Sequence, residues 1–231
     1  MDQRRTLAGA IHASGTGARI KRRVHDLVGL LVSISVLALT ALPIDESRVS
    51  ELEIEGFRWI NGFPDLLFAP VWVLMQLGNL VVVPVAVIAA LILRRFRLAL
   101  AAGLAGSLVW FLAKVAKQLV ERGRPAELIN EVVLRNAPAA GNGYISGHAA
   151  VAFALVAVAS PYLGRRGRIV AWLLATMVCL GRVYVGAHLL LDVVGGAAFG
   201  VAIGSLVNLM LGVPVGEHKV RPKTLSKQPF E

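Results

Sequence analysis

Charged residues are scarce in this sequence, and cysteine is almost absent. Only 16% of its 231 residues are Asp, Glu, Lys or Arg, against about 25% in soluble domains, whereas 56% are hydrophobic. So few charges cannot cover a globule in water, which excludes a disordered chain and an ordinary soluble domain. The single Cys179 excludes a disulfide framework or a cysteine metal cluster within one chain. The composition therefore predicts a protein whose solvent is a lipid bilayer.

Long hydrophobic runs, continuous rather than alternating, predict membrane-spanning helices. A bilayer core of about 30 Å needs roughly 20 apolar residues in a helix, and only helices or closed barrels satisfy every backbone polar group there. The runs predict an all-α bundle of six spans, at residues 27–44, 66–93, 98–120, 146–163, 169–186 and 188–211. Two prolines, Pro70 and Pro84, are expected to bend or bound the second span.

The distribution of basic residues predicts the orientation of these spans. Cytoplasmic loops of membrane proteins are rich in Lys and Arg. Here 16 of the 24 basic residues fall into four blocks: Arg4, Arg5, Arg19, Lys21, Arg22 and Arg23; Arg94, Arg95 and Arg97; Arg165, Arg166 and Arg168; and Lys219, Arg221, Lys223 and Lys227. Both termini are therefore expected in the cytoplasm, and the net charge of +10 needs no nucleic-acid partner. The excess of arginine over lysine hints at a bacterial source, and so at the plasma membrane.

The ends of the chain are expected to differ from the membrane domain between them. Residues 1–25 predict a basic cytoplasmic arm, 26–213 the six-helix domain, and 214–231 a basic cytoplasmic tail. A secretory signal peptide is the alternative at the N-terminus, but no Ala-x-Ala follows the first run and its removal would break the even span count. Between the first two spans, Ser50 to Glu53 predict a capping box that opens a short helix on the outer interface, with an ordinary loop as the alternative.

Ionisable residues at membrane depth cost about 2.5–3.5 kcal/mol each, so they mark functional sites by default. Lys117 closes the third span, and Arg124 follows seven residues later, about two helical turns, just before a proline. In the glycine-rich turn that comes next, Ser146 is placed as an N-cap, Gly147 admits a close ligand and His148 can donate a proton. Each feature also has a non-functional interpretation when it is taken alone. The Lys117 and Arg124 side chains could extend to the lipid headgroups, and His148 could be a structural residue.

A third cluster combines Arg182, His188 and Asp192. The last two are four residues apart, which would place them on one helix face, where the carboxylate can hold one ring nitrogen and leave the other as a nucleophile. Arg182 offers a planar fork for phosphate oxygens. A buried pair that only locks two helices is the alternative. In the predicted topology all three clusters lie at the outer ends of spans three to six, and such a set of cations, histidines and one carboxylate is typical of a phosphate site.

The three clusters resemble the type 2 phosphatidic acid phosphatase superfamily of integral membrane lipid phosphatases, whose fold is shared with vanadium-dependent haloperoxidases. That family's pattern is Lys, six residues, Arg-Pro; then Pro-Ser-Gly-His; then Ser-Arg, five residues, His, three residues, Asp. The matching residues are Lys117, Arg124 and Pro125; Ser146, Gly147 and His148; and Arg182, His188 and Asp192. Ile145 stands where Pro is usual and Gly181 where Ser is usual, and neither departure removes a catalytic group. The resemblance covers about residues 98–212.

The resemblance implies a role for each matching residue. His188 would attack phosphorus as the nucleophile, Asp192 would orient it, and His148 would protonate the leaving oxygen and later activate water. The phosphoryl oxygens would be held by Lys117, Arg124, Ser146, Gly147 and Arg182. No metal and no other cofactor is implied.

The expected function is that of a phosphatase for a lipid phosphate, such as a polyprenyl diphosphate, phosphatidic acid or phosphatidylglycerol phosphate, with its site on the extracytoplasmic face. The alternatives are a phosphotransferase, in which a lipid or sugar hydroxyl replaces water, and a non-catalytic lipid-phosphate binder or transporter. In the last span Gly196, Gly200 and Gly204 recur at four-residue intervals, which predicts close helix packing within the chain or a homodimer through that face.

Overall fold

The computed structural model describes residues 20–44 and 48–214, so most of the predicted arm and tail lie outside the described residues. The helical bundle occupies Arg22–Val213. In chain order the elements are β1 (Ile20–Lys21), α1 (Val24–Ala41), α2 (Glu51–Asn61), η1 (Asp65–Leu67), α3 (Phe68–Met75), η2 (Gln76–Gly78), α4 (Val82–Ile92), α5 (Phe96–Leu119), α6 (Pro125–Leu128), α7 (Gly147–Ala159), η3 (Ser160–Tyr162), α8 (Arg165–Tyr184), α9 (Leu190–Leu211) and β2 (Val213–Pro214).

The protein is an all-α polytopic membrane protein, as the sequence predicts. Four of the described helices are long and apolar enough to cross a bilayer: α1, α5, α8 and α9. A fifth candidate is the pair formed by α2 and the segment Asp65–Gly78, which is bent by 75°. The predicted count of six needs the shorter α4 and the α7–η3 segment to cross as well, and it stays a prediction.

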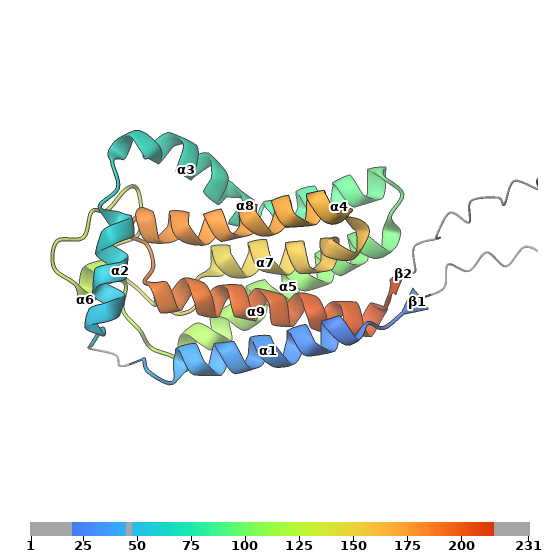
Figure 1. Cartoon of the computed structure of the whole chain (residues 1–231), viewed down its shortest axis with the longest axis horizontal. Helices are drawn as coiled ribbons and strands as arrows, with labels where there is room; N and C mark the ends of the chain where they lie inside the picture. The colour runs from blue at the N-terminus through green and yellow to red at the C-terminus, as the bar shows by residue number, and fades with distance from the viewer. Residues whose placement is uncertain (1–19, 45–47, 215–231) are drawn as a thin grey trace, which may run out of the picture. The chain divides into compact units, whose positions relative to one another are not determined.

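Helix α9 lies at the centre of the bundle, where it packs against α1, α5 and α7 (Figure 1). The largest hydrophobic cluster joins Val109 of α5, Val158 of α7 and Val207 of α9. Because lipid tails are as apolar as these side chains, close van der Waals packing rather than hydrophobic burial holds such helices together. The outward faces of α1 and α5 are correspondingly exposed and apolar.

The second predicted span is not one continuous helix. The chain breaks after Gly78, and the side-chain Oδ1 of Asn79 accepts a hydrogen bond from the backbone N–H of Val81 (3.1 Å) before α4 begins. The two prolines do not cause this break, because Pro70 and Pro84 each lie in the first turn of a helix, α3 and α4. A first-turn N–H has no partner within its own helix, so proline is tolerated there.

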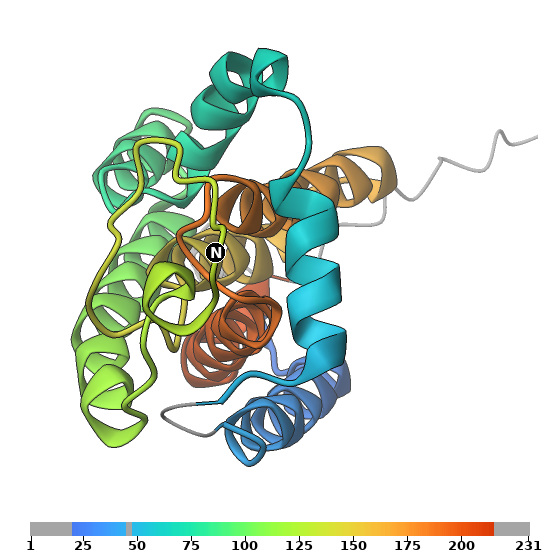
Figure 2. The same ribbon diagram turned by 90° about the vertical axis from the view of Figure 1, so that its left-hand side faces the viewer.

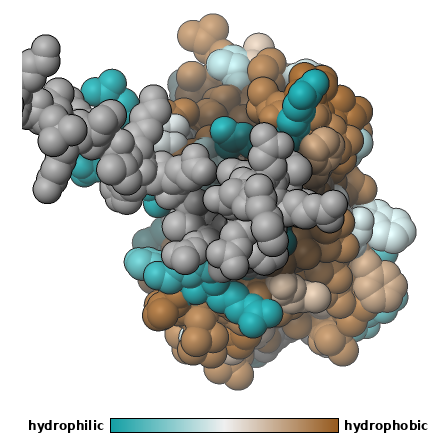
Figure 3. Space-filling view, turned by 90° about the vertical axis from the view of Figure 1, so that its right-hand side faces the viewer, coloured by the Kyte–Doolittle hydropathy of each residue, from teal (hydrophilic) through white to brown (hydrophobic). Residues whose placement is uncertain are grey.

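The arginine-rich blocks of the bundle meet at one end. Three arginines donate to backbone carbonyls across neighbouring elements: Arg22 to Leu209, Arg95 to Tyr162 and Arg97 to Leu211. Figure 3 views this end, where hydrophilic side chains adjoin the hydrophobic flanks of the helices. This shared position is what a cytoplasmic end requires under the positive-inside rule.

The glycines of α9 are used for packing inside the chain. A Cβ at Gly196 would stand 2.5 Å from the carbonyl oxygen of Ser146, and one at Gly204 would stand 2.5 Å from the Cβ of Ala157. All three glycines are buried against α7 or the Ser146 residue that precedes it. Because α7 occupies this face, the structure favours packing within the chain and gives no support to the alternative, a homodimer through Gly196, Gly200 and Gly204.

Replacing Gly200 with valine is expected to destabilise the bundle. A Cβ there would collide with the backbone carbonyl of Ala150, which cannot move without shifting α7. Overpacking of this kind costs about 1–3 kcal/mol, which would be measured as a lower unfolding midpoint in detergent. The matched control is Gly103→Ala in α5, where the new Cβ would only touch Val87 at 3.7 Å. An unchanged midpoint for Gly200→Val would contradict the packing described here.

Candidate active site

The predicted site residues come together at the other end of the bundle, where α5 and α8 end and α7 and α9 begin. Figure 2 views this end of the bundle, where α2 lies across the C-terminal end of α8 and the N-terminal end of α9. Backbone hydrogen bonds join the segments: the Ser146 N–H donates to the carbonyl of Asp192 (2.9 Å), and the Gly143 N–H donates to that of Arg122 (2.6 Å). All three sequence clusters therefore share one location.

His188 and Asp192 are neighbours, though not through a shared helix face. Because α9 begins at Leu190, His188 precedes the helix, and Asp192 lies in its first turn. The Oδ2 atom of Asp192 accepts a hydrogen bond from the backbone N–H of Leu189 (2.8 Å) and lies 3.7 Å from Nδ1 of His188. At 3.7 Å the carboxylate faces the ring without a full hydrogen bond, an arrangement common in catalytic sites before substrate binds.

Burial holds His188 in its neutral form. Only 3% of the residue is exposed, and this burial lowers its pKa to about 4, with the charges of Arg182 and Arg124 acting in the same direction and Asp192 opposing them. The imidazole is therefore uncharged at neutral pH, with a proton on one of its two ring nitrogens. Its Nδ1 faces Asp192, which leaves Nε2 as the ring nitrogen free of this contact.

Ser146 directly precedes α7, as predicted for an N-cap, but its side chain makes no capping hydrogen bond. Its Oγ atom is fully buried and has no hydrogen-bond partner among the described residues. A buried polar atom without a partner is costly, so such atoms in native structures point to an absent ligand or water. Beside it, a Cβ on Gly147 would meet no atom within 4 Å, and His148 follows in the first turn of α7. The backbone of Gly147 and the imidazole of His148 thus border open space at the N-terminus of α7, while the Ser146 hydroxyl is buried.

The three predicted cations surround this position. Lys117 donates from Nζ to the carbonyl of Asn142 (2.6 Å), and Arg124 donates to the carbonyls of Ala140 (3.0 Å) and Ala187 (2.9 Å). Arg182, in the last turn of α8, has a buried Nε atom that lacks a partner within the described ranges. Two of the cations are therefore held by backbone carbonyls, and the third has donor capacity to spare.

A cavity of about 270 Å³ opens beside the site. It is lined by Lys117, Gly147 and His148 on the polar side and by Val109, Trp110 and Val151 among the apolar residues. Gly78, Asn79 and Leu80 of the broken segment also line it. The cavity therefore joins predicted phosphate ligands to an apolar surface.

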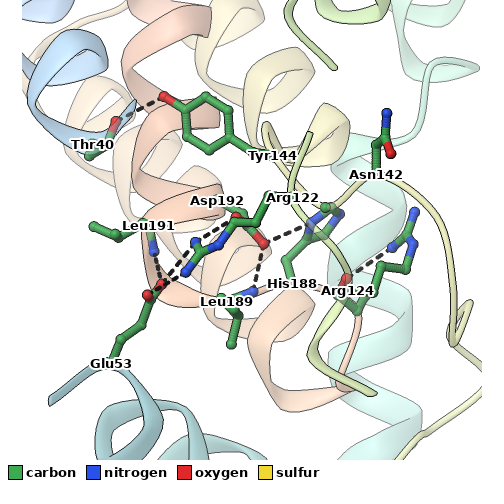
Figure 4. Close-up of polar contacts among 12 residues, drawn as sticks. Thr40, Glu53, Arg122, Arg124, Asn142, Tyr144, His188, Leu189, Leu191 and Asp192 are labelled. Atoms are coloured by element: carbon green, nitrogen blue, oxygen red, sulfur yellow. Dashed lines mark hydrogen bonds and ion pairs between the residues drawn. The ribbon is translucent and has the colours of Figure 1, made fainter. Parts of the chain in front are cut away.

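Two charged residues that the sequence analysis did not assign to this site lie beside it, Arg122 and Glu53. The guanidinium of Arg122 is buried and contacts both Asp192 and Glu53 (Figure 4). The capping box predicted at the start of α2 is only half present, because Ser50 accepts from the Glu53 N–H (3.3 Å) while the Glu53 carboxylate turns inward to Arg122. Arg122 has no sequence signal of its own, since a basic residue after a span ordinarily reaches for headgroups.

The departure at position 181 has a packing explanation. A Cβ on Gly181 would lie 2.7 Å from the Cγ of Met75 and 3.0 Å from a methyl carbon of Val71. Helix α3 therefore fills the space that a serine side chain would need. Ile145, the other departure, is fully buried in the hydrophobic cluster.

These features define a class of protein: an integral membrane protein with a buried histidine nucleophile candidate beside a cationic pocket. The family model described as the PAP2 superfamily matches residues 95–213, just over half of the chain. The chain belongs to the PAP2 superfamily, and it is a PAP2-type lipid phosphate phosphatase.

Two solved structures resemble this chain. The crystal structure of LpxE from Aquifex aeolicus is 29% identical, with a TM-score of 0.64 over 71% of this chain and 98% of that one. The crystal structure of a transmembrane PAP2-type phosphatidylglycerolphosphate phosphatase from Bacillus subtilis is 20% identical, with a TM-score of 0.59 over 80% of this chain and 95% of that one, and it shows a shared fold. A search of curated protein sequences gave no match.

Proposed function

We propose that this phosphatase hydrolyses a lipid phosphomonoester or diphosphate through a phosphohistidine at His188. The observation that carries the proposal is the set of buried, unpartnered polar atoms at the site, which includes Oγ of Ser146 and Nε of Arg182. A bound phosphoryl group would supply the acceptor oxygens that these donors lack. The buried, neutral imidazole of His188 supplies the nucleophile.

The reaction would proceed in two steps. In the first, Nε2 of His188 attacks phosphorus, the bond between phosphorus and the leaving oxygen breaks, and His148 gives that oxygen a proton. In the second, His148 takes a proton from water, whose oxygen attacks the phosphohistidine and releases inorganic phosphate and the free imidazole. Lys117, Arg124, Arg182 and the Ser146–Gly147 turn would neutralise the equatorial oxygens, which is the main requirement of phosphoryl transfer.

The substrate would lie with its phosphate among these cations and its tail in the bilayer. The apolar wall of the cavity beside Lys117 suits a lipid chain, so the candidate substrates are a polyprenyl diphosphate, phosphatidic acid and phosphatidylglycerol phosphate. With the arginine-rich end in the cytoplasm, six spans would place both termini inside and the site on the extracytoplasmic face, in a bacterial plasma membrane. No homodimer is needed for the site. The reaction as proposed uses no metal.

The test is phosphate release by the purified full-length protein in detergent with excess chelator, on each of the three lipids. Chelator-resistant release, with an acid-labile, base-stable phosphoenzyme when labelled substrate is quenched in alkali, is the expected result. A phosphorylated acceptor without inorganic phosphate would identify a phosphotransferase instead. Binding of all three lipids without turnover would identify a non-catalytic binder or transporter and overturn the proposal.

The pH dependence of kcat/KM should report the buried histidine. Because burial lowers the pKa of His188 to about 4, the nucleophile loses its lone pair only when the pH falls through that value. The acid limb is therefore expected well below pH 6.5, the ordinary value for histidine. The assay follows phosphate release from pH 3 to 8, with the phosphate ionisation of the lipid titrated separately in the same micelles. An acid limb centred on 6.5 that does not track the lipid's own ionisation would contradict a buried neutral nucleophile.

A further inference from the structure

A chain of buried charged groups stands behind His188. The two carboxylate oxygens of Asp192 have different partners: Oδ2 faces His188 and accepts from Leu189, while Oδ1 accepts a hydrogen bond from Nη1 of Arg122 (3.0 Å) (Figure 4). Rotation of the carboxylate would break contacts on both sides. The orientation of Asp192 towards the histidine therefore depends on Arg122.

Arg122 is itself fixed by Glu53, which belongs to a helix distant in sequence. Nη1 and Nη2 of Arg122 donate to Oε1 (3.2 Å) and Oε2 (2.5 Å) of Glu53, a two-pronged pair that only a guanidinium can make. Arg122 is only 2% exposed. Burial alone would lower its pKa, but the hydrogen bond to Glu53 and the charges of Asp192 and Glu53 raise it above the ordinary value, so Arg122 stays charged.

Glu53 also anchors the first turn of α9. Its Oε1 accepts a hydrogen bond from the backbone N–H of Leu191 (2.8 Å), one of the donors that a helix start leaves unpaired. Glu53 thus links Arg122 by hydrogen bonds to the helix that carries Asp192. Arg122 contacts Oδ1 of Asp192 whereas His188 faces Oδ2, so Arg122 and Glu53 reach the histidine only through this carboxylate.

We propose that Arg122 and Glu53 are positioning residues for phosphoryl transfer, which hold Asp192 against His188 and connect α2 to the nucleophile. The inference rests on the proposed role of His188. It assigns to α2 a part in catalysis, since a displacement of that helix would release the carboxylate that orients the ring.

The charges of the two residues give the proposal a distinctive signature. The charged and titratable groups near His188 are Asp192 from α9, Arg182 from α8, His148 from α7 and Arg124 at the start of α6, with Lys117 of α5 close to Arg124, Asp192 and Arg182. Replacing Arg122 with methionine removes a positive charge behind Asp192, which favours the imidazolium and moves the acid limb to higher pH. Glu53→Gln removes a negative charge and moves the limb to lower pH. The double variant should return it close to the wild-type position.

A conservative substitution separates geometry from charge. Arg122→Lys keeps the charge but loses the fork, so kcat is expected to fall about 10–100-fold, by analogy with the loss of an outer partner of a metal ligand, while KM and the acid limb stay near wild type. The matched control is Arg135→Met. Arg135 donates to Asp65 and to backbone carbonyls of the α2–α3 connection and α8, so its loss should lower the unfolding midpoint without moving the acid limb.

The experiment measures kcat, KM and the pH profile of each full-length variant in detergent, on whichever of the three lipids the wild type turns over fastest, beside its unfolding midpoint. Opposite shifts for Arg122→Met and Glu53→Gln support the proposal, and if Arg122→Met does not fold, Glu53→Gln with Arg122→Lys decides it. Folded variants with wild-type kcat and unshifted profiles overturn it. If His188→Ala stays active, the proposed function has failed; if His188→Ala is inactive and these variants are normal, only this inference has failed.

Discussion

Replacing His188 with alanine is expected to abolish turnover. Loss of a nucleophile that forms a covalent intermediate lowers kcat by about 10⁴-fold or more, because the cations left behind can position phosphate but cannot attack it. Lipid binding should change little, since Lys117, Arg124 and Arg182 remain. Phosphate release and equilibrium binding of the same lipid in detergent would be measured side by side.

The matched control for this substitution is His25→Ala. His25 is an exposed histidine near the start of α1, at the arginine-rich end of the bundle. It is expected to retain wild-type kcat and KM. Should His188→Ala keep more than about a hundredth of the wild-type rate, the residual activity would require another nucleophile, and the two-step reaction would have to be abandoned.

Replacing His148 with alanine should give the second largest effect, and its size should depend on the leaving group. Loss of a general acid costs about 10²–10⁴-fold. A lipid alkoxide needs a proton to depart, whereas an aryl phosphate such as p-nitrophenyl phosphate leaves without one. The loss in kcat/KM is therefore expected to be large for phosphatidic acid and small for the aryl phosphate.

The same variant offers a direct view of the intermediate. Because His148 also activates water, the second step should slow even when the first does not, so phosphoenzyme should accumulate from the aryl phosphate. Rapid quench into alkali and detection of labelled phosphohistidine would measure it. An equal loss of rate for both substrates, with no accumulation, would assign His148 to binding rather than to proton transfer.

Most helix positions could be predicted from hydrophobicity alone. The limits of the predicted third span, residues 98–120, lie within two residues of those of α5. A helix that crosses the bilayer needs a continuous apolar run, and this run is visible in the sequence. The break at Gly78–Asn79 could not be predicted, because it interrupts a run that has no charge. The spacing of His188 and Asp192 also predicts that both lie within one helix, which is wrong. His188 precedes α9, and Asp192 in the first turn accepts a hydrogen bond from the Leu189 N–H.

Arg122 shows why the site could be predicted only in part. The motif residues could be found from their spacing in the sequence. Arg122 and Glu53 are 69 residues apart, and their contact forms only in the folded chain. Glu53 was assigned to a capping box because local spacing favours one. The buried guanidinium instead draws its carboxylate inward, where an uncompensated charge would be far more costly than an open cap.

Under the proposed function, the cavity beside Lys117 would make turnover depend on the concentration of lipid substrate within the membrane. Its rim residues Leu80 and Trp110 are 40% and 50% exposed on the flank of the bundle, among the apolar side chains of α4 and α5. A lipid that arrives along this flank is encountered in two dimensions, so turnover depends on its mole fraction in the membrane rather than on its amount per volume. Inert lipid added at constant total substrate should slow the reaction by surface dilution.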